Sequence, residues 1–584
     1  MRKRTRIAFG LMALLFPSVL AGCYANLTET ATAAAVTYDE DDTEAATTDS
    51  AAGSIVLSGT SISFTGSGAT VSGTVITITA AGTYSVSGTL DDGRIVVNSA
   101  DSENVKLVLG GASISCSTGS PVEVLAAEKV VVTLAEGTVN SVADGASYSS
   151  TDGSNAAIYA TSDLTFNGSG SLAVDANYAT GIRSKDGLKI TGGVITVDSV
   201  GDGIKGRDYI AMKDGTVTVN AVGDGLQAYN DEDSSLGTIQ IDGGTLTVVA
   251  GSDGIQAEAS AAVSAGTVTI SSGGGSTAAS VGSTYDSFKG LKAVTGIAIS
   301  GGAFTISSYE DAIHCDAGIA ISGGTFSLAA RATSTGGGQG IKFGDSASMT
   351  VAAADIDISS SYEGISGYNL TINGGSINMT AVNDGFNMTA GTVEGGSETD
   401  DGSKLCINGG TIAVYVTAGD GVDVNGSASM TGGTLIVHDA YNTIENAVDT
   451  NGGFSITGGL LVASAGYSSG MTKNLTSSSQ YSVLTVLSSA QNAGVLFHIQ
   501  DSGGTDLCTF NPAYKYQCVI FSSPGIVKGT AYTVYYGGSD DGTATDGLYS
   551  DGTYTAGTSY KTFTPSSTYA ITVGSTSRTT GPGR

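Results

Sequence analysis

The chain has 584 residues, of which 86 are Gly, 6 are Pro and none is Trp, and only 13% are charged. This shortage of strong helix formers and excess of Gly excludes long-helix and coiled-coil proteins and favours strands and turns. The 24 basic against 54 acidic residues give a net charge of −30, which excludes nucleic acid as a partner and favours cations, neutral ligands or cation-bridged ligands.

The amino terminus has the pattern of a bacterial lipoprotein signal. Four basic residues precede an apolar run over 7–21 that is too short to span a bilayer comfortably. The run ends in Leu20-Ala21-Gly22-Cys23, which resembles the lipobox in which the Cys receives the lipid. We therefore predict a signal peptide over 1–22, a lipidated Cys23, and an extracytoplasmic, membrane-anchored or cell-surface protein.

The next segments differ in composition. Residues 23–53 are rich in Thr, Ala, Asp and Glu with little to bury, so we predict a disordered tether. Residues 54–150 are strand-rich and off-register with the repeat described below, which predicts an amino-terminal β cap. Residues 475–540 are also strand-rich and predict a second β cap. A cap is needed because the open end of a repeat would expose unpaired backbone and the hydrophobic core. Residues 541–584 predict a low-complexity tail.

A repeat runs through residues 151–474. Each copy has a small or acidic residue, then Gly or Ala, then an aliphatic or Phe, and five of the eleven intervals are 21 or 22 residues. The copies are 156–158, 180–182, 202–204, 224–226, 253–255, 289–291, 311–313, 339–341, 363–365, 384–386, 420–422 and 442–444. A period near 22 with insertions at fixed places is typical of a solenoid.

Each copy also contains short alternating strands around a Gly pair, as in Leu188 to Val197. The Gly pair supplies positive φ at a corner, and alternation directs one face inward. Three short strands per copy without a helix predict an all-β, single-stranded parallel β-helix of about twelve coils with β-rich caps at both ends.

The first position of the repeat carries many acids, and Asp202, Asp224 and Asp253 are consecutive. Carboxylates stacked about 5 Å apart repel one another, and Ca²⁺, with its six to eight oxygen ligands, would neutralise them. Asn230, Asp231 and Asp233 follow in a loop and extend this predicted calcium site. The alternative is turn chemistry, in which each Asp accepts backbone amides.

A second column of side chains lies one residue beyond each buried aliphatic. Alternation places it on the outer face, where basic and amide groups suit the carboxylates and hydroxyls of a sugar chain. An ordinary solvated face is the alternative. The candidate carbohydrate-binding residues are Arg183, Lys205, Gln227, Gln256, Lys292, His314 and Lys342, and the column continues to Glu445.

These motifs, above all Gly201-Asp202-Gly203-Ile204-Lys205, Leu188 to Val197 and Asn230-Asp231-Glu232-Asp233, resemble the bacterial carbohydrate-binding-domain proteins once listed as a domain of unknown function. The resemblance covers residues 54–540. It implies a right-handed parallel β-helix, similar in fold to pectate lyases, that binds calcium, cellulose and acidic plant polysaccharides. Thr180, Lys289 and Gln339 depart from the acidic pattern, which limits calcium to part of the repeat.

We therefore expect a monomeric, lipid-anchored protein that binds cellulose-like or polygalacturonate-like polymers without catalysis. One alternative is a calcium-dependent polysaccharide lyase with Lys205 as the base, because β-elimination needs a base beside a polarised uronate. Another is a surface adhesin without glycan binding. Cys508 and Cys518 flank a predicted turn; they either form a disulfide or pack as small apolar residues.

Overall fold

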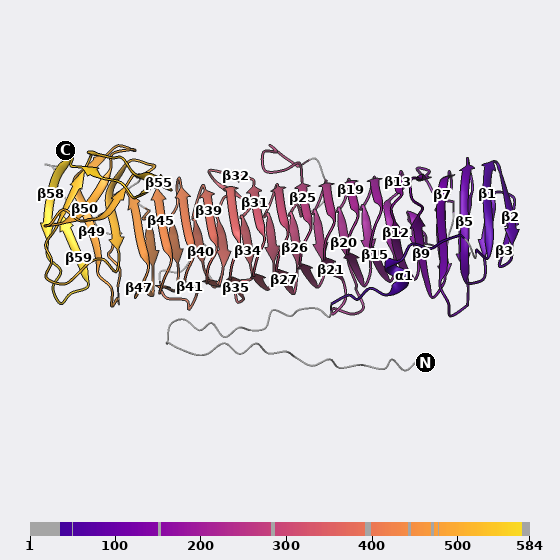
Figure 1. The fold of residues 1–584 in the computed structure, drawn as a ribbon, viewed down its shortest axis with the longest axis horizontal. Helices are drawn as coiled ribbons and strands as arrows, with labels where there is room; N and C mark the ends of the chain where they lie inside the picture. Colours follow the sequence, from indigo (N-terminus) through magenta and orange to yellow (C-terminus); the bar gives the residue numbers. More distant parts are fainter. Residues whose placement is uncertain are drawn as a thin grey trace.

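The computed structural model describes residues 35–48, 51–149, 153–281, 287–391, 399–441, 445–468, 472–476 and 478–574. The molecule is an elongated rod in which short strands run across the long axis (Figure 1). One short helix, α1 (Glu40–Thr43), lies against the side of the rod. The predicted signal peptide and Cys23 lie outside the described residues.

The strands form three stacks. Successive coils pair in parallel within each stack, except that the first two strands of the first stack pair antiparallel. In the repeat copies, the strand of the first stack comes just after the repeated acidic position in the sequence. These strands form a sheet of their own. It consists of β3 (Ala69–Ser72), β4 (Val75–Ile78), β6 (Arg94–Asn98), β8 (Val122–Ala126), β11 (Ala156–Ala160), β14 (Thr180–Ser184), β17 (Ile204–Gly206), β20 (Leu226–Ala228), β23 (Ile255–Ala257), β26 (Leu291–Ala293), β29 (Ile313–Cys315), β34 (Ile341–Phe343), β37 (Ile365–Gly367), β40 (Phe386–Met388), β43 (Val422–Val424) and β46 (Val448–Thr450).

The second stack lies beyond the next turn. It consists of β9 (Lys129–Leu134), β12 (Asp163–Gly168), β15 (Gly187–Ile190), β18 (Tyr209–Met212), β21 (Thr238–Ile241), β24 (Ser260–Val263), β27 (Gly296–Ile299), β30 (Gly318–Ile321), β35 (Ser348–Val351), β38 (Asn369–Ile372), β41 (Lys404–Ile407), β44 (Ser427–Met430) and β47 (Gly453–Ile456).

The third stack completes each coil. It consists of β10 (Val139–Asp144), β13 (Ser171–Ala176), β16 (Val194–Ser199), β19 (Thr216–Ala221), β22 (Thr245–Ala250), β25 (Thr267–Ser272), β28 (Ala303–Ser308), β31 (Thr325–Ala330), β36 (Asp355–Ser360), β39 (Ser376–Ala381), β42 (Thr411–Val416), β45 (Thr434–Asp439) and β48 (Leu460–Ala465). The expectation of an all-β protein with long parallel sheets and a β-helix-like solenoid is confirmed.

The sequence of each coil explains its shape. In β19 the residues Val217 and Val219 are buried while their neighbours face outward, so the strand presents one apolar face to the core. At the corners, the second Gly of each pair has positive φ, as at Gly193 (87°) and Gly375 (89°), a conformation that other residues rarely adopt. Aliphatic side chains of successive coils therefore stack into one continuous core.

The amino-terminal end is built from β1 (Gly53–Gly59), β2 (Ser61–Gly66), β5 (Gly82–Leu90) and β7 (Val105–Cys116). β2 pairs antiparallel with β1, and β7 joins β9 and β10 of the stacks. Parallel coil-to-coil pairing therefore already begins before residue 151, since β8 pairs with β11 and β9 with β12.

The carboxy-terminal end departs from the predicted tail. β49 (Ser482–Gln491) and β52 (Tyr516–Ser522) pair antiparallel, and β59 (Ala570–Gly574) pairs with β49. A separate sheet contains β50 (Phe497–Asp501), β51 (Asp506–Phe510), β53 (Tyr532–Tyr536), β55 (Thr543–Thr545), β56 (Leu548–Ser550) and β58 (Thr558–Phe563). Small pairs complete the fold: β32 (Ala332–Thr333) with β33 (Gly336–Gly337), and β54 (Ser539–Asp540) with β57 (Tyr554–Thr555). Residues 541–574 thus belong to the cap, because Phe563 and Val573 pack into its core.

One further expectation is corrected, and the structure agrees with one of two open alternatives. The twelfth repeat copy, predicted at 442–444, lies outside the described residues, and Asn446-Ala447-Val448 instead pairs with Asp420-Gly421-Val422. Cys508 and Cys518 are both buried and unpaired, as small apolar residues would be.

The predicted tether differs most from the structure. Residues 35–48, here named the strap, lie along the outer face of the second stack, where Asp42 is completely buried. Low hydrophobicity predicts disorder only when a segment finds no partner surface. Here the acidic residues of the strap find lysines of the rod.

Candidate functional site

The predicted carbohydrate-binding residues form one straight column on the outer face of the first stack. Each is the middle residue of a strand, or near it, and successive members are direct cross-strand partners. The paired residues run Arg183, Lys205, Gln227, Gln256, Lys292, His314 and Lys342, from β14 to β34. Parallel pairing spaces them by about 4.8 Å per coil. We call this array the polar column.

The acids at the first repeat position stack alongside the polar column and bind backbone. Asp202 Oδ1 accepts the amide of Asp224 at 3.1 Å, and Asp224 Oδ1 accepts the amide of Asp253 at 3.1 Å. Asp253 Oδ1 accepts the amide of Lys289 at 2.7 Å. One oxygen of each carboxylate thus fastens its coil to the next, which is the turn chemistry that the sequence left as an alternative.

The second oxygen of each acid faces the polar column. Lys205 Nζ lies 3.3 Å from Asp202 Oδ2, and Lys292 Nζ lies 3.4 Å from Asp253 Oδ2. Gln227 Nε2 donates to Asp224 Oδ2 at 2.5 Å. The two columns therefore form a half-buried network in which most basic groups already have an acidic partner.

The column side chains also bind one another. Lys205 donates to the side-chain oxygen of Gln227, and Gln227 donates to Gln256 Oε1 at 2.9 Å. At the ends, Arg183 donates to Asn155 Oδ1 at 2.8 Å and Lys342 to Asp345 Oδ1 at 3.2 Å. These contacts hold the side chains in fixed positions along the rod axis.

The predicted calcium loop lies apart from the three stacked acids. Asp202, Asp224 and Asp253 precede the strands of the first stack, whereas the loop follows β20 at the opposite end. Asn230 Oδ1 accepts the amides of Glu232 and Asp233, and Asp231 pairs with Arg207 at 3.2 Å. The structure thus separates two groups that the sequence analysis joined.

The residues present do not fit a calcium ion at the predicted site. The oxygens of Asp202, Asp224 and Asp253 accept from backbone amides, Lys205, Gln227 and Lys292, so a cation would have to displace protein donors. Across the described part of the chain, no group of three or more His, Cys, Asp or Glu side chains is arranged to hold a metal. We derive no chemistry through calcium.

The predicted repulsion between stacked acids nevertheless exists. Burial raises the pKa of Asp224 to about 6, and the neighbouring charges of Asp202 and Asp253 act in the same direction. The effect grows toward the carboxy-terminal coils, where acids replace lysines in the column: Asp423 pairs with Asn387 and Asp449. The sequence analysis ended this column at Glu445, whereas the structure places Asp449 next to Asp423.

Three buried acids, Asp384, Asp420 and Asp439, gather in these last coils together with the half-buried Asp423. Burial, reinforced by neighbouring carboxylates, raises the pKa of Asp384 to about 8 and that of Asp439 to about 8. The same causes raise the pKa of Asp420 to about 9 and that of Asp423 to about 7. Both carboxylate oxygens of Asp439 are buried without a hydrogen-bond partner. These raised pKa values favour the protonated form of Asp384, Asp420 and Asp439 near neutral pH.

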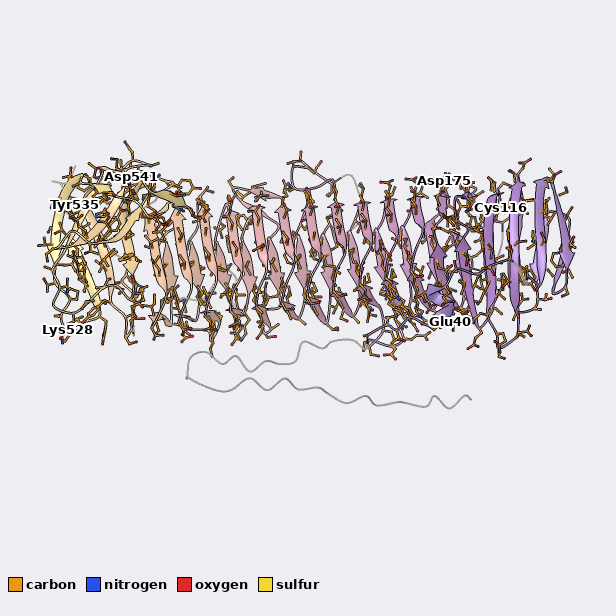
Figure 2. The ribbon with its side chains drawn as sticks, in the orientation of Figure 1. Glu40, Cys116, Asp175, Lys528, Tyr535 and Asp541 are labelled. Carbon is orange, nitrogen blue, oxygen red and sulfur yellow. The ribbon has the colours of Figure 1, made fainter. Side chains whose placement is uncertain are left out.

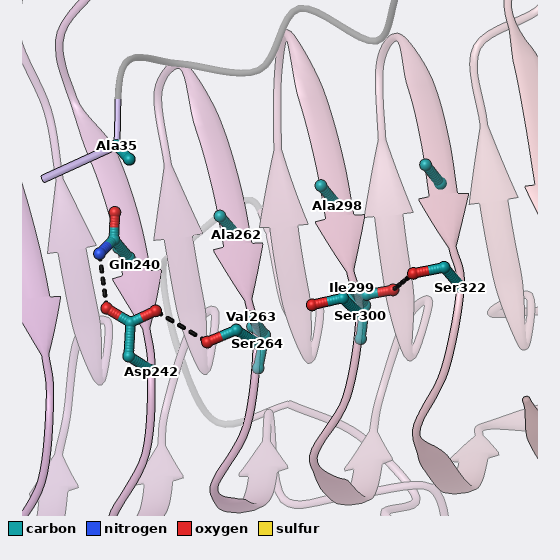
Figure 3. Close-up of a pocket in the computed structure, with 11 residues that line it drawn as sticks. Ala35, Gln240, Asp242, Ala262, Val263, Ser264, Ala298, Ile299, Ser300 and Ser322 are labelled. Carbon is teal, nitrogen blue, oxygen red and sulfur yellow. Dashed lines mark hydrogen bonds between the residues drawn. The ribbon is translucent and has the colours of Figure 1, made fainter. Parts of the chain in front are cut away.

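A second surface feature lies on the second stack and was not predicted. The strap covers β9, β12 and β15, and a groove of about 270 Å³ continues beyond its first residue, Ala35. Side chains from successive coils line this groove, and most of them are Ala or Ser. Figure 3 shows Gln240, Asp242, Ala262, Ser264, Ala298 and Ser322. The cue in the sequence was the run of alanines at equivalent outward positions, Ala262, Ala298 and Ala320.

Within the described residues, no helix has the length and apolar character needed to cross a membrane.

Comparisons with known proteins identify relatives of the part of the chain that contains most of the polar column. Residues 72–336 match the family model of the carbohydrate-binding domain-containing protein. A curated relative of that name from Acetivibrio thermocellus is 36% identical over 134 residues, which cover 22% of this chain and 47% of that protein. The alignment thus spans about half the length of that relative.

A solved structure, the polysaccharide lyase-like protein from C. thermocellum as a gadolinium derivative, is 34% identical. The match covers 38% of this chain and 90% of the chain of the solved structure, with a TM-score of 0.36. The family match includes the polar column from Arg183 to His314. The resemblance found in the sequence is confirmed: residues 72–336 match the family model of the carbohydrate-binding domain-containing protein, and a curated relative has the same name.

Proposed function

We propose that the protein binds a polysaccharide along the polar column. The observation that carries this proposal is the register of the column, which places one polar side chain per coil on a straight line from Arg183 to Lys342. A polysaccharide is itself a linear repeat of hydroxyl-bearing rings. A periodic array of donors and acceptors suits it better than it suits a compact ligand.

The contacts within the column favour hydroxyl recognition. Lys205 and Lys292 are paired with acids and are each 20% exposed at the side chain. Each such ion pair has a net charge near zero. Its ammonium can still donate hydrogen bonds to a ligand in the solvent, and its carboxylate can still accept them. We therefore infer that the column favours neutral, cellulose-like chains over polygalacturonate-like chains.

The lipid anchor extends this proposal. Because Cys23 follows a lipobox-like sequence, we propose that the protein is a bacterial lipoprotein whose rod lies outside the cytoplasm. Monomeric behaviour stays a prediction.

The sequence prediction of calcium at Asp202, Asp224 and Asp253 implies that removal of the metal lowers the thermal midpoint. Because protein donors already satisfy these carboxylates, we expect verified removal of calcium with EDTA to leave the thermal midpoint unchanged. A lowered midpoint would restore the structural-metal prediction.

Lyase activity is the alternative, with Lys205 as the base. A base needs a free lone pair, whereas the Lys205 ammonium donates to Gln227 and lies 3.3 Å from Asp202. This arrangement favours binding without catalysis. The surface-adhesin alternative predicts retention of no glycan at all.

Paired substitutions test the proposal. Gln227→Ala with Gln256→Ala removes two adjacent column members, and we expect at least about ten-fold weaker retention on cellulose. The matched control is Thr218→Ala with Thr247→Ala, which lies on the same coils in the third stack. Ultraviolet absorbance of polygalacturonate mixtures, followed in parallel, reports any unsaturated product. Equal retention of both variants would contradict the column, and rising absorbance would favour the lyase.

A further inference from the structure

The strap binds the rod through its carboxylates. Asp42 is completely buried, with Lys129 Nζ 2.9 Å from one carboxylate oxygen and Lys189 Nζ 2.7 Å from the other. Lys129 also pairs with Asp39 at 2.7 Å, and Lys106 pairs with Asp41 at 2.5 Å. Three lysines from three different coils thus form ion pairs with Asp39, Asp41 and Asp42 of the strap.

The remaining contacts use polar groups of the same face. Thr165 donates to Asp42 Oδ1 at 2.7 Å, and Asn167 donates to the carbonyl of Glu44 at 3.1 Å. Further along, Gln240 binds the backbone of Val36 through both its amide oxygen and its amide nitrogen. The surface therefore recognises an extended acidic chain over the coils from β7 to β21.

Charge makes this surface unusual for the molecule. The whole chain has a net charge of −30 with only 24 basic residues. Lys106, Lys129, Lys189 and Lys213 nevertheless all contact the strap, the last through the ring of Tyr38 at 5.3 Å. The strap itself contains five acids and no base. We name the surface beneath it the lysine groove.

We propose that the lysine groove is a second binding site, which takes a carboxylated polysaccharide, and that the strap is its intramolecular occupant and competitor. The ligand class rests on the proposed carbohydrate-binding function, whereas the site itself is separate from the polar column. A uronate polymer presents carboxylates at regular intervals along an extended chain. It would pair with Lys106, Lys129 and Lys189 as the strap does.

The acids within the groove favour a sugar over a phosphate polymer. Asp242 accepts the hydroxyl of Tyr38 at 3.1 Å, and Asp163, which is cross-strand to Lys129, accepts the hydroxyl of Tyr209 at 3.2 Å. Such carboxylates bind sugar hydroxyls but repel a polymer that bears a charge on every unit and no hydroxyl donors. The groove continues past Ala35 over Ala262 and Ala298, which gives a polymer room beside the strap.

Competition has a calculable effect on affinity. If the docked strap outnumbers the released form by about 100 to 1, the apparent affinity for the polymer falls about 100-fold. Removing the strap carboxylates would raise the apparent affinity for the polymer by the same factor. An uncharged polymer of the same backbone would gain nothing, because it cannot replace the ion pairs.

The experiment uses the full chain with polygalacturonate and its fully methyl-esterified, uncharged form. We expect the triple variant Asp39→Asn, Asp41→Asn, Asp42→Asn to bind polygalacturonate at least about ten-fold more tightly, with no gain for the esterified form. Glu40→Gln is the matched control, since Glu40 is exposed on the same helix and none of the lysines binds it (Figure 2). Adding Lys129→Gln and Lys189→Gln to the triple variant should abolish the gain.

Hydrogen exchange of the unmodified chain gives a readout independent of folding of the variants. Polygalacturonate should accelerate exchange of the amides at 36–44, and the esterified polymer should not. Amides that stay protected under saturating polygalacturonate, together with an unchanged affinity of the triple variant, would overturn the inference. Retention on cellulose in the same samples then shows whether the proposed function itself still holds.

Discussion

Two buried carboxylates of this molecule have opposite environments. Burial alone would raise the pKa of Asp42, but hydrogen bonds from Lys189, from the amide of Asp39 and from Lys129 outweigh it and lower the pKa to about 2. Asp439 has no such donors, so burial and the charges of Glu445 and Asp384 raise its pKa to about 8. One acid is therefore charged and structural, and the other is neutral near pH 7.

Substitution of Asp42 tests the first environment. Asp42→Asn removes the carboxylate that pairs with Lys189 and leaves Lys129 with Asp39 alone. Breaking a buried pair in this way costs about 3–5 kcal/mol. We expect the strap to release, so the loss is limited to the free energy of its docking. Hydrogen exchange at 36–44 measures it, and Glu40→Gln should leave exchange unchanged. Because the folded pKa of Asp42 is lowered, its contribution is present above about pH 4 and is lost as pH falls through about 2.

Substitution of Asp439 tests the second. A raised folded pKa means that the native state holds the proton more tightly than the unfolded chain, so stability is highest below about pH 4 and is lost as pH rises through about 8. At pH 9 we expect Asp439→Asn to have a higher thermal midpoint than the native chain and a free energy of unfolding larger by about 1–3 kcal/mol. The gain should be smaller at pH 5. Asp357→Asn, an exposed acid, is the control. A stabilisation independent of pH would argue against a charge effect.

At the scale of elements, local patterns predicted the repeat but not the contacts between distant segments. The Asp-Gly-aliphatic motif and the Gly pairs fix a corner and a buried position within one coil, so the parallel stacks and the polar column could be predicted. The strap could not, because Asp42 meets Thr165 and Lys189, which lie 123 and 147 residues away. The charge imbalance near Asp439 was missed because this buried acid ends its strand at a position where most strands of the third stack have Ala or Ser.

The small residue of each repeat copy is an element-level requirement. A Cβ at Gly225 would lie 2.2 Å from Val248 Cγ1 and 2.5 Å from the carbonyl oxygen of Gly254. We expect Gly225→Val to destabilise the fold by about 1–3 kcal/mol or more through overpacking, seen as a lower thermal midpoint. Gly225→Ala should cost less, because the chain itself places Ala312 at an equivalent position. Equal midpoints for Val and Ala would contradict this account of the corner.

At the scale of the whole molecule, the carboxy-terminal strands close the rod. β59 pairs with β49, and Phe563 and Val573 belong to the buried cluster of the cap. A chain that ends at Gly538 would expose that cluster and leave β49 with a free edge, a known route to aggregation. We expect it to unfold at a lower temperature and to self-associate, measured by light scattering during a thermal scan. An unchanged midpoint would return this segment to the status of a loose tail.

The docked strap determines where the rod is attached. With the lipid on Cys23 that the sequence predicts, 12 residues separate the anchor from Ala35 on the side of the rod, which allows at most about 40 Å of reach. With the strap released, 30 residues lead to Gly53 near the amino-terminal end, which allows about 100 Å. If Cys23 carries the predicted lipid, a docked strap would therefore hold the side of the rod close to the membrane surface. Release of the strap would let the rod extend farther from the bilayer.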